Sequence, residues 1–203
     1  AVHFIHWLED HVARTIHRYR MFEKSDRLLL AVSGGKDSLV LWEILTILGY
    51  KVDGLYVNLG IDEGIDYSRQ SANVSSRFAV DRELSLTQLN VRKKYGLSIP
   101  EAAERTYRTK NRTCSICGLT KRHIFDEQAS SAGYDVLITG HNLDDEAAVL
   151  FGNTTHWISR YLARQYPVLE AEGGFVRKVK PLCRAYERET AAYAILKGIE
   201  YYE

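Results

Sequence analysis

A glycine-bearing run, SGGKDS at residues 33–38, constrains the fold of this chain more than any other feature. It follows an apolar, strand-like segment at 28–32 and precedes a helix-like segment at 39–45. Two glycines let the backbone turn tightly, and a helix that starts there offers unpaired N–H groups and the positive end of its dipole. Lys36 adds a cation and Ser38 a hydroxyl. An ordinary strand–turn–helix connection needs none of this, so the run predicts a phosphate-binding loop.

The length, net charge and composition of the chain restrict the class of protein. A chain of 203 residues fits one domain with a sizeable core. A net charge of +1 does not by itself indicate that the chain binds nucleic acid, so any evidence for such binding has to come from a local cluster of basic residues. No apolar run approaches membrane-spanning length and the N-terminus lacks a signal-peptide pattern, so we expect a cytoplasmic chain with no membrane partner. Three cysteines are too few for a disulfide framework.

Strand-like and helix-like segments alternate along the chain. The patterns predict strands at 28–32, 51–58, 83–89 and 135–139, and helices at 3–22, 39–45, 66–79, 100–110, from Cys117 to about Gly133, 147–151 and 187–196. The stretch 153–178 is hard to interpret beyond a short helix at 157–161 and a turn at Gly173–Gly174, and 199–202 reads as a strand or loop. The alternation indicates an α/β fold, a parallel sheet with helices on both faces and ligands at the carboxyl ends of the strands.

A second glycine-bearing motif, GHNLDDE at 140–146, also falls where a strand gives way to a helix. Asp144 and Asp145 can hold Mg²⁺ against phosphates or handle protons there. The alternative is that these carboxylates only complement a helix N-terminus, which beside a phosphate loop is the weaker interpretation. His141 is either a catalytic group or an ordinary, partly buried histidine.

Cys114 and Cys117 form a C-x-x-C motif. Two thiolates at this spacing can share a metal ion or an iron of a cluster, and a complete site needs at least one more ligand. A redox dithiol and an inert pair remain alternatives. Cys183 is the only other cysteine.

Basic residues surround this motif, with no acidic residue from 105 to 125. A solvated helix face usually mixes signs, so this stripe favours contact with a phosphate backbone, and Tyr107 can stack on a base. The cations of the stripe are Arg105, Arg108, Lys110, Arg112, Lys121, Arg122 and His123.

The first motif lacks P-loop spacing and instead resembles the PP-loop of ATP pyrophosphatases, the adenine nucleotide alpha hydrolase-like fold. Together with CSICGLTKR at 114–122 and GHNLDDEAAVLFGN at 140–153, it resembles the TtuA-type tRNA 2-thiouridine synthetases, relatives of the cytoplasmic wobble-uridine thiolases. The resemblance covers essentially the whole chain. It implies ATP-dependent adenylation of a uridine C2 oxygen, followed by sulfur transfer and release of AMP, and the third motif looks closer to the T-loop enzymes.

The resemblance also implies roles for individual residues. Lys121 is expected to stabilise phosphate or the activated uridine, and Asp145 to handle Mg²⁺ or protons, with Asp144 beside it. Cys114 and Cys117 are expected to ligate a [4Fe–4S] cluster. The expected ATP-binding residues are Ser33, Gly34, Gly35, Lys36, Asp37 and Ser38 for the phosphates, Ala31, Gly54, Leu55 and Tyr56 for adenine and ribose, and Gly140 close to the nucleotide.

Members of this family carry zinc modules on both sides of the catalytic domain. In this sequence the cysteines of the first module are missing and His3 resembles its last ligand, so we expect residues 1–24 to be a helix left from that module, with His3 as an orphan zinc ligand. We expect 25–203 to be the PP-loop catalytic domain, in a chain truncated at both ends from which the flanking zinc modules are absent. The third cluster cysteine is expected beyond Glu203 rather than at Cys183. The implied partners are tRNA, a ubiquitin-like sulfur carrier and a second copy of the chain.

Two other interpretations stay open. The first motif alone also fits another PP-loop adenylating enzyme: a lysidine synthetase, a 2-thiocytidine synthetase, a wobble-uridine enzyme or an amidating ligase, although the C-x-x-C motif argues against lysidine synthetases and amidating ligases. The other interpretation is a non-catalytic scaffold that binds tRNA or zinc. Intact Lys36, Lys121, Asp144 and Asp145 argue against it.

Overall fold

The computed structural model describes residues 1–61, 66–105, 113–162 and 165–202. Its strands form a six-stranded sheet in the order β3-β2-β1-β4-β6-β5. All neighbours are parallel except β5, which is antiparallel to β6 at the edge. The bounds are β1 Leu28–Val32, β2 Val52–Asn58, β3 Leu86–Asn90, β4 Val136–Ile138, β5 Val168–Leu169 and β6 Arg177–Val179.

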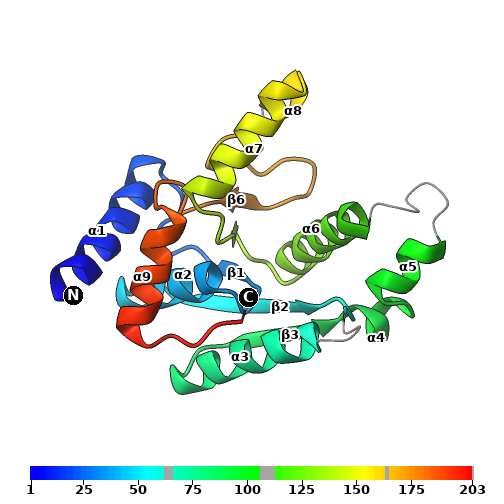
Figure 1. Ribbon diagram of the computed structural model, residues 1–203, viewed down its shortest axis with the longest axis horizontal. Coiled ribbons are helices and arrows are strands. Elements are labelled where there is room, and N and C mark those ends of the chain that lie inside the picture. Colours follow the sequence, from blue (N-terminus) through cyan, green and yellow to red (C-terminus); the bar gives the residue numbers. More distant parts are fainter. Residues whose placement is uncertain (62–65, 106–112, 163–164, 203) are drawn as a thin grey trace.

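Helices connect these strands and cover the sheet on both faces (Figure 1). The predicted α/β class is therefore confirmed. None of the described helices is long and apolar enough to cross a membrane. Their bounds are α1 Val2–Arg18, α2 Lys36–Ile47, α3 Tyr67–Asp81, α4 Val91–Tyr95, α5 Ile99–Arg105, α6 Thr113–Ser131, α7 Leu143–Thr155, α8 Ser159–Leu162 and α9 Glu187–Lys197.

The predicted boundaries differ from the observed ones in places. Helix α6 begins at Thr113 rather than after Cys117, so the C-x-x-C motif is helical. Helix α7 begins at Leu143 because Asn142 caps it, four residues before the predicted start. The short strands β5 and β6 were missed since two or three residues are too few to show an alternating pattern. The predicted helix at 100–110 is described only to Arg105.

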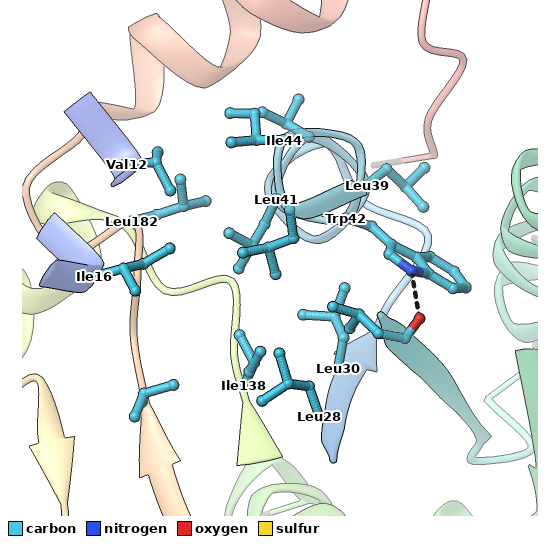
Figure 2. Close-up of a cluster of buried hydrophobic side chains, with 14 of the residues drawn as sticks. Val12, Ile16, Leu28, Leu30, Leu39, Leu41, Trp42, Ile44, Ile138 and Leu182 are labelled. Atoms are coloured by element: carbon cyan, nitrogen blue, oxygen red, sulfur yellow. Dashed lines mark hydrogen bonds between the residues drawn. The ribbon is translucent and has the colours of Figure 1, made fainter. Parts of the chain in front are cut away.

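Two apolar cores lie on opposite faces of the sheet, because successive side chains of a strand point to opposite faces. Leu28, Leu30 and Val32 belong to the first core, which α1, α2, α3 and α9 cover (Figure 2). Leu29 belongs to the second core, together with Leu137 of β4 and residues of α6. The first core includes Leu8, Val12 and Ile16 of α1, so the N-terminal helix packs into the same core as the phosphate loop's own strand.

Candidate functional site

A cavity of about 520 Å³ lies at the carboxyl ends of β1, β2 and β4. Both glycine-bearing motifs line it, together with four residues of α6. The two glycine-bearing motifs, predicted to lie at the carboxyl ends of the strands, therefore meet there at one cavity. The lining residues include Ala31, Ser33, Gly35, Lys36, Asp37 and Ser38 from the first segment, Tyr56 of β2, Tyr67 of α3, Gly118, Lys121, Arg122 and Phe125 of α6, Thr139, Gly140, His141 and Asp145 from the second motif, and Tyr202.

The phosphate loop is held by its own serines. The Ser38 hydroxyl donates to Gly35 O at 2.9 Å and accepts from the Ser33 N–H at 3.2 Å. Gly34 has φ +82°, and a Cβ at this position would lie 2.7 Å from Ser71 O of α3. Both observations require glycine there. Gly35 precedes α2 without a side-chain cap, which leaves the first turn of the helix open to an anion.

Gly140 brings the second motif against this loop. A Cβ at Gly140 would lie 3.0 Å from Ser38 N and 3.2 Å from the Asp37 carbonyl carbon. Both are backbone atoms at the start of α2, so any larger residue would push the two motifs apart. Glycine at position 140 therefore lets the second motif lie in contact with the start of α2.

The two adjacent carboxylates do not act as a pair. Asp145 lines the cavity and forms a capping box with Asn142, in which each backbone N–H donates to the other side chain at 3.0 Å. The Asp144 carboxylate instead accepts the Glu187 backbone N–H at 2.7 Å. The interpretation as a helix-terminus complement therefore describes Asp144, whereas Asp145 caps α7 and also faces the cavity.

The predicted adenine segment is divided as well. Ala31 and Tyr56 line the cavity, and the Tyr56 hydroxyl donates to Ser68 O at 2.8 Å. Gly54 lies against the ring of Trp42, where an added Cβ would come within 2.3 Å of Cη2. Leu55 is 1% exposed and belongs to the second core. Gly54 and Leu55 are thus packing residues and do not face the cavity.

Helix α6 carries Lys121 and Arg122 to the wall of the cavity that the phosphate loop also lines. Cys117 is half-buried against the second core and immediately precedes Gly118, which lines the cavity. Cys114 lies three residues earlier in the same helix. A thiol at an apolar edge beside an open cavity fits a ligand of an iron–sulfur cluster.

Cys183 lies in the other core. It is 6% exposed and packs with the first core, so the sheet separates it from Cys117. Burial, and next the charge of Glu146, raises the pKa of the Cys183 thiol to about 11. This environment suits a protonated packing residue rather than a metal ligand.

The remaining predicted site residues are His3, His141 and the basic residues around the C-x-x-C motif. His3 is exposed on α1, and within the described residues no group of three or more His, Cys, Asp or Glu side chains is placed to hold a metal ion. His141 lies on the cavity wall with Nδ1 2.9 Å from the Thr139 hydroxyl oxygen. Desolvation, with Lys180 nearby, lowers the pKa of His141. Four residues predicted to contact nucleic acid lie outside the described residues: Tyr107, Arg108, Lys110 and Arg112.

Sequence reasoning missed several residues of the site, among them Tyr67, Phe125 and Thr139, and two that come from far along the chain. Tyr202 lines the cavity, and its backbone N–H donates to Gly34 O at 2.9 Å; its ring centroid lies 5.6 Å from that of Tyr67. Glu187 of α9 contacts Lys36. Neither has a local sequence signal, since both reach the loop from more than 150 residues away along the chain.

No protein-family model matches the chain. Curated relatives do: it is 45% identical over 199 residues to the tRNA-5-methyluridine(54) 2-sulfurtransferase of Thermus thermophilus and 42% identical to that of Pyrococcus horikoshii, in each case over 98% of this chain. It is also 33% identical to the cytoplasmic tRNA 2-thiolation protein 1 of Caenorhabditis elegans, over 96% of this chain and 52% of that protein. The chain spans 60% and 62% of the lengths of the first two relatives.

Solved structures agree on the fold. The U34-tRNA thiolase NcsA from Methanococcus maripaludis, solved with its [4Fe–4S] cluster, matches with a TM-score of 0.84 at 25% identity, over 98% of this chain and 65% of that one. An NH3-dependent NAD synthetase from Campylobacter jejuni matches with a TM-score of 0.60 at 14% identity, over 97% of this chain and 73% of that one, which speaks for the fold alone. The predicted PP-loop ATP pyrophosphatase fold is confirmed.

Proposed function

Because this chain is a relative of the tRNA-5-methyluridine(54) 2-sulfurtransferases along nearly its whole length, we propose that it takes part in ATP-dependent 2-thiolation of tRNA. The observation that carries the proposal is that two elements meet at one cavity: the phosphate loop and α6, the helix that carries both the C-x-x-C motif and Lys121. The substrate is proposed to be a T-loop uridine, since the relatives at 38–45% identity bear that name, whereas the U34 thiolase is 25% identical.

ATP is proposed to bind with its phosphates on the loop at 33–38 and its adenosine toward Ala31 and Tyr56. The uridine C2 oxygen attacks the α-phosphorus and pyrophosphate leaves, after which sulfur attacks C2 and AMP leaves. Backbone N–H groups at the start of α2 are proposed to stabilise the charge that develops on pyrophosphate. Lys121 and Asp145 line the same cavity. Lys121 is proposed to stabilise charge on the α-phosphate, and Asp145 to bind Mg²⁺ or handle a proton.

Cys114 and Cys117 are proposed to hold a [4Fe–4S] cluster, with a third cysteine from beyond Glu203. The chemistry that such a cluster supplies is an iron site at which incoming sulfur can bind. The half-buried thiol of Cys117 and the neighbouring cavity are consistent with that role. We further propose that zinc modules flank residues 25–203 on both sides. The first of them would precede the helix at residues 1–24, with His3 as a zinc ligand.

The proposed partners beyond tRNA are a second copy of the chain and a ubiquitin-like sulfur carrier. Helices α7 and α8 extend away from the sheet (Figure 1), and these helices and the turn between them expose apolar side chains, which supports an interface there. The exposed fractions of Phe151 and Trp157 are 72% and 90%. Light scattering of the purified protein tests whether it forms a dimer. We also propose that the protein is located in the cytoplasm.

The function is tested on protein purified without oxygen, with iron, sulfide and zinc analysis, and with product analysis in the presence and absence of tRNA. We expect ATP to give AMP and pyrophosphate, and 2-thiouridine to form in the T-loop. Cys114→Ala and Cys117→Ala should abolish the visible absorbance of the cluster and thiolation but not nucleotide binding, whereas Cys183→Ala should retain the absorbance. ADP as the sole product, thiolation at position 34, or stoichiometric zinc at the C-x-x-C motif of an active protein would contradict the proposal.

A further inference from the structure

The cation of the phosphate loop is already paired with carboxylates. Lys36 is 7% exposed, and its Nζ lies 2.9 Å from Glu187 Oε1 and 3.4 Å from Asp37 Oδ2. A lysine at this place in the loop is expected to meet the phosphates of ATP. The Glu187 carboxylate therefore already occupies a position beside Lys36 at which a phosphate of the nucleotide would bind.

Glu187 and Lys36 differ in their freedom to move. The Glu187 side chain is 58% exposed, whereas that of Lys36 is 9% exposed. The carboxylate can turn into solvent at little cost, while the ammonium is confined between the loop and α9. An ion pair with one exposed partner contributes little stability, so incoming phosphate can displace it.

The backbone of Glu187 is held independently of its side chain. Its N–H donates to the Asp144 carboxylate, and Thr190, one turn later, donates its hydroxyl to Asp37 Oδ1. The start of α9 is thus tied to both motifs that line the cavity. Removal of the Glu187 carboxylate would leave these ties in place.

We propose that Glu187 is a positioning residue that stands in for a nucleotide phosphate on Lys36: it holds the ammonium in the loop before ATP binds and yields its place when ATP binds. This role rests on the proposed ATP-dependent function. It assigns to α9 a direct part in nucleotide affinity. Glu187 touches Lys36 and acts through it.

The test is the affinity of the full chain for a non-hydrolysable ATP analogue, measured by calorimetry without tRNA. Glu187→Gln removes the competing charge and should raise the affinity about three- to tenfold, as expected for removal of a weak competing ion pair and of like-charge repulsion. In Glu187→Asp the side chain is too short to keep the 2.9 Å ion pair, so the affinity of this variant should lie between those of the parent protein and Glu187→Gln. Glu170→Gln is the matched control: its carboxylate is 68% exposed and pairs with Arg177, and the affinity should not change.

A double-mutant cycle with Lys36→Ala separates this role from a purely structural one. In the Lys36→Ala background, Glu187→Gln should change affinity less than it does in the parent protein. Equal affinities of the parent and Glu187→Gln, or the same effect of Glu187→Gln with and without Lys36, would overturn the role of Glu187. Failure of the parent protein itself to bind the analogue would overturn the proposed function as well.

Discussion

Gly54→Ala is the substitution for which the structure gives the sharpest expectation. An added Cβ would lie 2.3, 2.8 and 2.9 Å from three ring carbons of Trp42. Trp42 is fully buried, and its indole N–H donates to Val52 O at 3.1 Å, the dashed line in Figure 2. The centroid of its ring lies 5.7 Å from that of Phe78. The indole therefore has to move, and its hydrogen bond is the interaction most sensitive to that movement.

The expected decrease in stability follows from these contacts. Overpacking of a core costs about 1–3 kcal/mol, and a buried donor left without its partner costs about 1–3 kcal/mol. Gly54 does not have a positive φ, so alanine recovers about 0.4–1 kcal/mol through the unfolded chain. We expect Gly54→Ala to lower the free energy of unfolding by about 2–4 kcal/mol, a large part of the stability of a typical domain.

Urea unfolding followed by far-UV circular dichroism measures this change as a shift of the midpoint. In Trp42→Phe the ring atoms that clash are absent, so the double variant should be less destabilised than the sum of the single variants by about 1 kcal/mol or more. Gly152→Ala is the control, since a Cβ there meets nothing within 4 Å and should stabilise α7 slightly. A decrease below about 0.5 kcal/mol for Gly54→Ala, or strict additivity with Trp42→Phe, would refute the packing argument.

Three further outcomes are expected. Lys36→Ala should lower nucleotide affinity at least tenfold, because a charge-assisted hydrogen bond is worth about 1.5–3 kcal/mol; unchanged affinity in calorimetry would contradict this. Arg122→Glu should weaken tRNA binding and flatten its salt dependence by about one unit of slope for each phosphate that the protein no longer neutralises, whereas an unchanged slope would identify Arg122 as a solvated cation. The thiol of Cys183, with a pKa of about 11, should resist iodoacetamide at pH 8 and gain reactivity as the pH rises towards 11 or when urea unfolds the chain; alkylation in the native protein as fast as that of Cys117 would show that burial does not control it.

Much of the fold was predictable because its signals are local. The strand at 28–32, the glycine turn and the following helix lie next to one another in the chain, and their order with the later strands requires a parallel sheet covered on both faces. The meeting of the two motifs at one edge followed from the same rule, since the carboxyl ends of parallel strands share an edge. Helix starts were less predictable: Asn142 begins α7 through a capping box, and the aspartates that form and follow this cap read equally well as metal ligands.

The phosphate loop, the class of the sheet and the cation and thiol pattern of α6 can be derived from the residues alone, because backbone conformation and side-chain chemistry within a few residues suffice for these. Which residue of a motif faces the cavity depends on the folded arrangement of the whole chain. Asp144 and Asp145 are neighbours in sequence, yet one caps α9 and the other lines the cavity. The same holds for Gly54, which packs under Trp42, and for Cys183, which the sheet separates from Cys117. Side chains on successive residues point in different directions, and what each one meets depends on elements that the chain contributes much earlier or later, as Glu187 does for Lys36.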